Sequence, residues 1–251
     1  MAGVIDEKIA ERRRAIREGR RRSRLRRTVT AVLLVMLVVG LVALERSALV
    51  GLEEIRVVGA DRVEEDAVRA ATELELGTST LRLRLGRVEE RVARLPAVRV
   101  ASARRLDPLT VLIEVAEREP RLVAESEGDR ALVDREGVLF EEGREDGLPR
   151  IRIDGGLPEV GSSVAEDAAL ENAFRAWRGL TGPLRAEVVR YEAAGVDDLV
   201  LELESGLLVR FGRAHRVDEK VRALGVILED IDDAEISEID VRAPSSPVVV
   251  P

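Results

Sequence analysis

The sequence predicts an α+β protein that crosses a membrane once and carries most of its residues on the external side. Residues 28–44 contain no charged side chain and follow eleven Lys or Arg residues. Such a basic flank is typical of the cytoplasmic side of a span. Beyond this run, apolar patterns of strand and helix period alternate along the chain. They predict an external strand-helix-helix-strand-strand domain, followed by a mainly antiparallel β domain carrying two helices.

The uncharged run is the first predicted element. Its seventeen residues would rise about 25 Å as a helix, against a hydrocarbon core of about 30 Å, and Arg26 and Arg27 can reach the headgroups. A buried soluble helix would need a polar face, which the run lacks. A cleaved signal peptide is the nearer alternative, although Leu41-Val42-Ala43 is a poor cleavage site. We interpret residues 1–27 as a basic cytoplasmic tail and 28–44 as an uncleaved transmembrane signal anchor.

Charge divides the chain at this run. Residues 1–27 hold eleven basic and four acidic residues, whereas residues 45–251 hold 29 basic and 44 acidic residues. The positive tail suits anionic lipid headgroups, or acts only as a topology signal. The acidic external part argues against nucleic acid as a partner. Because cysteine is absent, disulfides and thiolate chemistry are excluded and packing must hold the external fold.

The first external domain is predicted at residues 55–119, after a linker at 45–54. A strand at 55–58 precedes a helix that Asp61 can cap and Gly77 can end. The remaining predicted elements are a helix at Leu85–Leu95, ended by Pro96, and two strands at Val98–Leu106 and Leu109–Glu117, turned at Asp107-Pro108.

Residues 120–243 change to short strands separated by turns. Asp134-Arg-Glu-Gly137 predicts a hairpin, because glycine permits a positive φ. Ser163 can cap a helix in which Trp177 belongs to the buried stripe. The tail, residues 244–251, is expected to be flexible because its prolines cannot continue a ladder. The other predicted elements are strands at 148–151, 184–191, 199–203 and 207–211, a helix whose apolar face carries Val217, Val221, Leu224, Leu228 and Ile231, and a last strand at 236–241.

Seven short motifs follow one another in the chain: Ile55-Arg-Val-Val-Gly59, Leu95-Pro-Ala-Val98, Ala103-Arg-Arg-Leu-Asp-Pro108, Ile113-Glu-Val-Ala-Glu-Arg-Glu-Pro120, Leu132-Val-Asp-Arg-Glu-Gly-Val-Leu-Phe140, Leu148-Pro-Arg-Ile151 and Ile239-Asp-Val-Arg242. In this order, after a lone signal anchor, they resemble the FtsQ/DivIB family of bacterial cell-division proteins. The resemblance covers nearly the whole chain and implies a POTRA domain at 55–119 and an FtsQ-type β domain at 120–243. Two departures are Leu106-Asp107-Pro108, where many members have an aromatic residue, and Ala243, where some have tyrosine.

The resemblance implies a function without catalysis or a cofactor. It implies a divisome scaffold that binds FtsB/DivIC-type and FtsL-type single-span partners and helps to control septal peptidoglycan synthesis. The protein would lie in the cell membrane with type II topology, concentrated at the division septum. Two alternatives stay open: a POTRA-containing membrane-anchored protein for protein assembly or secretion, and an external sensor or wall-modifying enzyme. The assembly machines usually carry a membrane barrel, for which the chain lacks long alternating strands.

The residues themselves offer no recognisable active site. The single histidine, His215, precedes a predicted helix and has no nucleophile motif around it. The acidic run at residues 229–235 lacks the glycine and spacing of a calcium loop, and no phosphate-binding pattern follows Gly155-Gly156. We therefore predict no catalytic, cofactor-binding or metal-binding residue.

The last predicted strand is the candidate partner-binding edge. An exposed edge strand can pair with an extended segment of another protein. In the family that the chain resembles, this end of the β domain is where the FtsB-type partner docks. The alternative is an interior or self-covered strand. The candidate residues are Ile236, Ser237, Glu238, Ile239, Asp240, Val241 and Arg242 in the strand, and Val217, Lys220, Val221 and Leu224 in the preceding helix.

Overall fold

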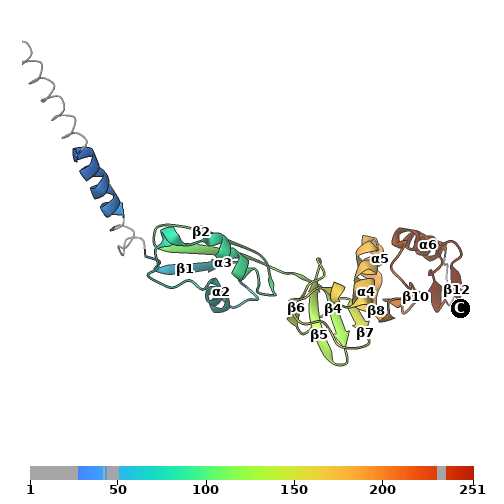
Figure 1. Cartoon of the computed structure of the whole chain (residues 1–251). Coiled ribbons are helices and arrows are strands. Elements are labelled where there is room, and N and C mark those ends of the chain that lie inside the picture. The colour runs from blue at the N-terminus through green and yellow to red at the C-terminus, as the bar shows by residue number, and fades with distance from the viewer. Residues whose placement is uncertain (1–27, 42, 44–50, 231–235) are drawn as a thin grey trace, which may run out of the picture. The chain divides into compact units, whose positions relative to one another are not determined.

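The computed structural model describes residues 28–41, 43, 51–230 and 236–251 (Figure 1). Residues 28–41 form a helix whose side chains are exposed. Within the described ranges, no helix is both long enough and apolar enough to cross a membrane. The predicted basic tail lies outside these ranges, as do positions 42 and 44 of the predicted signal anchor.

A three-stranded sheet with the strand order β1-β3-β2 forms the first folded region. Its elements follow the predicted order of strand, helix, helix, strand and strand, with an added 3-10 turn. They are β1 (Glu54–Val58), α2 (Glu65–Thr72), the 3-10 turn (Thr80–Arg82), α3 (Leu85–Val92), β2 (Val98–Arg105) and β3 (Thr110–Glu117). Small branched side chains supply the buried positions, among them Val57, Val68, Val88, Val92, Val111, Ile113 and Val115.

Helix α2 is shorter than predicted at both ends. The backbone N–H groups of residues 61–63 each donate to the Glu117 carboxylate at 2.9 Å. This segment is therefore a loop, and Asp61 does not cap the helix, which begins at Glu65. The helix ends at Thr72 because Glu73 adopts a left-handed backbone with φ of 50°. The prediction that it runs to Gly77 is wrong.

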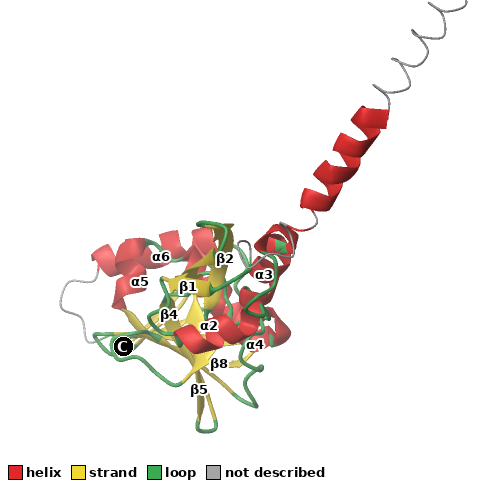
Figure 2. Ribbon diagram, turned by 90° about the vertical axis from the view of Figure 1, so that its left-hand side faces the viewer, coloured by secondary structure: helices red, strands yellow, loops and turns green. Residues whose placement is uncertain are grey.

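The second region is a nine-stranded sheet in the order β12-β11-β10-β9-β8-β7-β4-β5-β6. Three neighbouring pairs are parallel, namely β4–β7, β7–β8 and β10–β11. The others are antiparallel, as predicted. The β4–β5 hairpin extends beyond the rest of the sheet (Figure 2). The strands are β4 (Pro120–Ser126), β5 (Asp129–Asp134), β6 (Leu139–Glu142), β7 (Arg150–Ile153), β8 (Val188–Gly195), β9 (Asp198–Leu203), β10 (Leu208–Arg210), β11 (Glu238–Asp240) and β12 (Val248–Val250).

The second region also contains three described helices and a 3-10 turn. They are the turn at Val164–Glu166 and the helices α4 (Ala168–Gly179), α5 (Gly182–Glu187) and α6 (Val217–Asp230). The sequence predicted two helices and a strand from residue 184. The strand instead begins at residue 188, because Pro183 occupies the first turn of α5, where its missing N–H costs no helical hydrogen bond.

The cap of α4 also differs from the prediction. Asp167 caps it by accepting the Leu170 N–H at 2.8 Å, whereas Ser163 caps the 3-10 turn. Trp177 is 7% exposed and belongs to the core, which confirms that part of the prediction.

One large core joins these helices to the sheet. Leu170 of α4, Leu224 of α6, Ile151 of β7 and Leu201 of β9 are fully buried in it. Burying each such side chain contributes about 1.5–3 kcal/mol relative to exposure. Ile239 of β11 is also at 0% exposure, so the strand that was predicted to bind a partner is part of the core.

Candidate partner-binding edge

Strand β11 lies inside the sheet, and the prediction that it forms the edge is wrong. It pairs in parallel with β10, where Ile239 faces Val209. On its other side it pairs antiparallel with β12, where Ile239 faces Val249. The observed edge is thus β12, in the tail that was expected to be flexible.

The prolines of the tail flank β12 without interrupting it. Pro247 precedes the strand and Pro251 follows it, so all three residues between them can extend. The Ser246 N–H donates to the Ala243 carbonyl at 3.0 Å. This bond closes the turn that brings β12 back onto β11. The signal that the sequence interpretation missed is the run of three β-branched valines, which favours a strand.

The residues of the predicted binding strand make their contacts within their own domain. Ile239 and Val241 are buried in the core. Glu238 pairs with Arg210 at 2.5 Å, and Arg242 pairs with Asp240 at 2.6 Å. The hydrogen bonds from Arg242 hold the pKa of the Asp240 carboxyl below its usual range. The other two positions are also engaged: Ile236 packs against the core, and the Ser237 N–H donates to the Val250 carbonyl at 3.0 Å.

The predicted helix residues likewise face inward. Lys220 is 1% exposed and donates to the carbonyls of Phe211 at 2.6 Å and Arg213 at 2.8 Å. Burial lowers its pKa. Val221 and Leu224 belong to the core, and Val217 packs at its margin. Most of these residues therefore hold α6 against the sheet and offer little surface to a partner.

The exposed face of α6 consists of other residues. Asp218, Arg222, Val226 and Glu229 are exposed and recur at intervals of three or four residues, so they share one side of the helix. Val226 is 66% exposed. Helix α6 and strand β12 belong to the same end of the domain, where Figure 1 shows α6 above β12 and the C-terminus.

The backbone of β12 has a defined orientation. The Val250 carbonyl accepts from Ser237, so the polar groups of Val250 face β11. Successive residues of a strand direct their N–H and C=O groups to opposite sides. The N–H and C=O of Val249 consequently face outward, away from β11. The side chains of Val248, Val249 and Val250 are 41–56% exposed.

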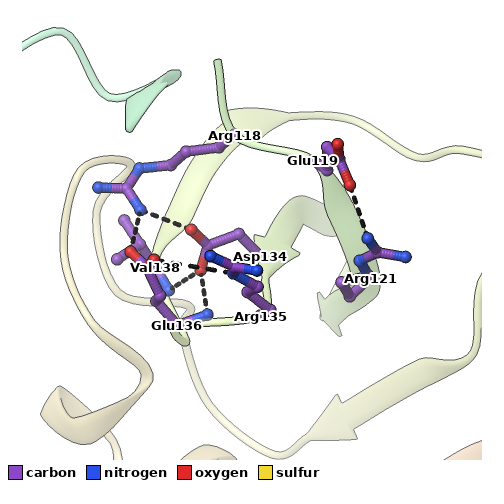
Figure 3. A network of polar contacts seen from close by, with 7 residues as sticks. All are labelled: Arg118, Glu119, Arg121, Asp134, Arg135, Glu136 and Val138. Carbon is purple, nitrogen blue, oxygen red and sulfur yellow. Dashed lines mark hydrogen bonds and ion pairs between the residues drawn. The ribbon is translucent and has the colours of Figure 1, made fainter. Parts of the chain in front are cut away.

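A separate polar cluster surrounds the turn between β5 and β6 (Figure 3). Asp134 is 1% exposed and accepts from Arg118 at 2.5 Å. Its other oxygen accepts the N–H groups of Glu136 at 2.8 Å and Val138 at 3.0 Å. The carboxylate thus organises the predicted hairpin turn. Every polar atom of this carboxylate is occupied by these structural bonds.

The described residues show no group of three or more potential metal ligands. His215 is exposed and lies 3.2 Å from the Arg213 carbonyl through its Nδ1 atom. Residues 231–235 of the acidic run at 229–235 lie outside the described ranges.

Two family models match the two folded regions. The FtsQ-type POTRA domain matches residues 50–118. The C-terminal domain of cell division protein FtsQ/DivIB matches residues 122–242. The chain belongs to the FtsQ/DivIB family of cell-division proteins. The match to the FtsQ/DivIB C-terminal domain ends before β12, so the observed edge lies beyond it.

Relatives named cell division protein FtsQ support this assignment. The protein from Streptomyces bingchenggensis is 28% identical over 94% of this chain and 89% of the relative. The one from Mycobacteroides abscessus is 26% identical over 90% of this chain and 70% of the relative. A third, from Mycolicibacterium smegmatis, is 29% identical over 78% of this chain and 56% of the relative. The FtsQ/DivIB family acts in cell division and is not a family of known enzymes.

Proposed function

We propose that this protein is a membrane-anchored scaffold of the division machinery that captures an extended segment of a partner along β12. The observation that carries the proposal is the one-sided pairing of this strand. Within the described residues β12 pairs with β11 alone. Unpaired backbone groups at a sheet edge are a template for a further strand. This edge replaces the one that the sequence predicted at residues 236–241.

The proposed partners are single-span division proteins of the FtsB/DivIC and FtsL types. An added strand would take the outward N–H and C=O of Val249, and the exposed valines would cover its side chains. The exposed side of α6, from Asp218 to Glu229, provides a mixed apolar and charged surface on a helix at the same end of the domain. Backbone pairing supplies affinity and such flanking contacts supply specificity. Binding of these partners would couple the protein to septal peptidoglycan synthesis.

Anchoring in the cell membrane at the septum is part of the proposal. The support is the uncharged run at residues 28–44 and the eleven basic residues before it. The basic side would stay in the cytoplasm and the two folded regions would lie outside. Alkaline phosphatase fused after residue 251 should be active, and a cytoplasmic reporter at the same place should be inactive. The reverse pattern would contradict the proposed topology.

Proline at Val249 is the sharpest test of partner capture. Val249→Pro deletes the outward N–H and leaves the bonds between Val250 and β11 in place. We expect the full-length variant to fold and to lose most of its crosslinking to FtsB/DivIC-type protein in cells. Val249→Thr is the matched control, because it keeps the N–H and the β-branched shape. It should capture the partner as the unmodified chain does.

The crosslinking results distinguish the proposed docking edge and the proposed division role from their alternatives. If folded Val249→Pro captures the partner normally, β12 is not the docking edge, and the exposed side of α6 becomes the candidate. If crosslinking of the unmodified chain captures barrel proteins or secreted substrates in place of division proteins, the role in protein assembly or secretion replaces the division scaffold.

A further inference from the structure

Three leucines are exposed at one end of the three-stranded sheet. Leu76 is 67% exposed, Leu81 is 60% exposed and Leu106 is 45% exposed. The first two belong to the loop between α2 and α3, and the third follows β2. Leucine side chains in water forgo the stabilisation that burial would give. Three of them on neighbouring loops indicate a surface that meets an apolar environment.

Backbone hydrogen bonds attach the first of these loops to the chain segment that enters the domain. The Leu52 N–H donates to the Thr78 carbonyl at 2.9 Å, and the Gly77 N–H donates to the Leu52 carbonyl at 2.7 Å. Gly51 forms an antiparallel bridge with Ser79. Leu76 and Leu81 therefore flank the segment that is paired with residues 51–52.

Side chains fix the second loop to the first. Arg105 donates through Nε to the Thr80 carbonyl at 2.7 Å and through its terminal nitrogen to the Leu83 carbonyl at 2.9 Å. The Thr80 hydroxyl donates to the Pro108 carbonyl at 2.6 Å. Leu106 is thus held on the same end of the sheet as Leu81. The exposure of the leucines arises within ordered, hydrogen-bonded loops.

The length of chain between this end and the apolar helix limits their separation. Ala43 is the last described helical residue before Gly51. A fully extended chain spans at most about 3.3–3.6 Å per residue. Gly51, where the entering segment is bonded to these loops, therefore lies within about 30 Å of Ala43. This upper bound allows the loops to reach the headgroup layer, which is about 5–8 Å thick on each side of the bilayer.

Charge around the leucines is mixed. Arg82, Arg84 and Arg104 are exposed there, together with the acids Glu75 and Asp107. The Asp107 carboxylate accepts the N–H groups of Leu109 and Thr110. Arginine beside leucine suits a lipid interface, where the guanidinium can bind phosphate while the leucine enters the acyl boundary.

We propose that the loop at residues 74–85 and the turn at 106–109 rest on the external surface of the membrane. Leu76, Leu81 and Leu106 would enter the headgroup boundary, and the exposed Arg84 would bind lipid phosphate. The inference rests on the proposed anchoring of residues 28–44. This contact would fix the height and tilt of the first folded region above the bilayer.

The absence of cysteine allows an experiment with single labels. Full-length Leu76→Cys and Leu81→Cys are labelled with an environment-sensitive fluorophore and reconstituted into vesicles of phosphatidylglycerol and phosphatidylethanolamine. Lipids with a nitroxide close to the headgroup serve as shallow quenchers. Both labels should shift to shorter emission wavelength and lose most of their intensity. Val226→Cys on α6, with 66% exposure in the unmodified chain, is the matched control and should show neither change.

A separate label tests the membrane anchor. Full-length Val35→Cys, within the apolar helix, carries the same fluorophore, and its quenching is measured with lipids that carry the nitroxide near the bilayer centre. If the label at residue 35 is quenched and those at 76 and 81 behave like the label at 226, the anchor stands and the surface contact is overturned. If the labels at 76 and 81 are quenched by shallow nitroxides while the label at 35 is not quenched, the contact stands and the proposed anchor fails. If none is quenched, both are overturned.

Discussion

The two edges of the nine-stranded sheet differ in how far other parts of the chain cover them. At one end, residues 161–164 cover β6: the Leu139 N–H donates to the Ser162 carbonyl at 3.0 Å, and the Gly161 N–H donates to the Leu139 carbonyl at 2.7 Å. At the other end, β12 pairs with β11 alone within the described residues. Proteins commonly protect edge strands from unwanted pairing. Within the described residues, one edge is covered and the other carries three valines, and this difference supports the proposal that a partner binds at β12.

The largest expected effect is the difference in stability between a truncation in β11 and a truncation in β12. Ile239→Ala removes buried methylene groups and should lower the free energy of unfolding by about 2–5 kcal/mol. Val249→Ala truncates a side chain that is 41% exposed and should cost about 0.5 kcal/mol or less. Denaturant unfolding of the two variants measures the difference. Equal losses would contradict the placement of β11 inside the sheet and β12 at its edge.

A smaller effect is expected at the covered edge. Gly137 has a φ of 84°, and a Cβ there would lie 2.9 Å from side-chain atoms of Phe174 and Val164. Gly137→Ala should cost about 1–3 kcal/mol through the left-handed backbone and this crowding. Gly147→Ala is the matched control, because φ is 83° and nothing lies within 4 Å of its Cβ. Thermal unfolding should rank Gly137→Ala as the less stable variant. The opposite ranking would contradict the packing of residues 161–164 beside β6.

The smallest expected effect is the pH dependence of stability that arises from the buried Lys220. Its amino group is bonded to the carbonyls that follow β10, and burial lowers its pKa from 10.5. Below the folded-state pKa, the charged group destabilises the fold by a constant amount. Between the two pKa values the unfolded chain binds more protons, so this cost falls as pH rises toward 10.5. The stability of the unmodified chain relative to Lys220→Met should therefore increase with pH.

Arg222→Met is the control for this measurement. Arg222 is exposed on the same helix, and arginine stays charged over this pH range. The stability difference between the unmodified chain and Arg222→Met should stay constant. A difference for Lys220→Met that is also independent of pH would contradict a lowered pKa for Lys220.

Apolar periodicity was sufficient to predict the order of elements in the first folded region. Val111, Ile113 and Val115 alternate with less buried positions only in part, yet the strand predicted at 109–117 is observed at 110–117. Helix ends were harder to predict, because Glu117 lies far from residues 61–63 in the sequence and still determines where α2 begins. Contacts of this kind cannot be derived from local pattern.

The sequence placed the edge of the sheet on the strand that is now β11, whereas the observed edge is β12. A pattern of apolar residues identifies a strand but does not name its neighbours, so β11 could not be distinguished from an edge. The prolines around residues 248–250 predict a flexible tail, whereas the three valines between them favour a strand. Lys220 was predicted to contact a partner. Its burial depends on two carbonyls, at residues 211 and 213, that a distant loop conformation brings to it.

The parallel pairings of β7 impose an order on folding. The hairpins β4–β5 and β8–β9 join neighbours in sequence, and such local pairs close within microseconds. Strand β7, only residues 150–153, must then pair with β4 on one side and β8 on the other. These non-local parallel contacts form slowly, because the chain between the strands loses conformational entropy before the strand pairing stabilises the fold. Among the described strands, these four residues are the single hydrogen-bonded link between the three strands β4, β5 and β6 and the five strands on the other side, so the continuity of the whole sheet depends on them.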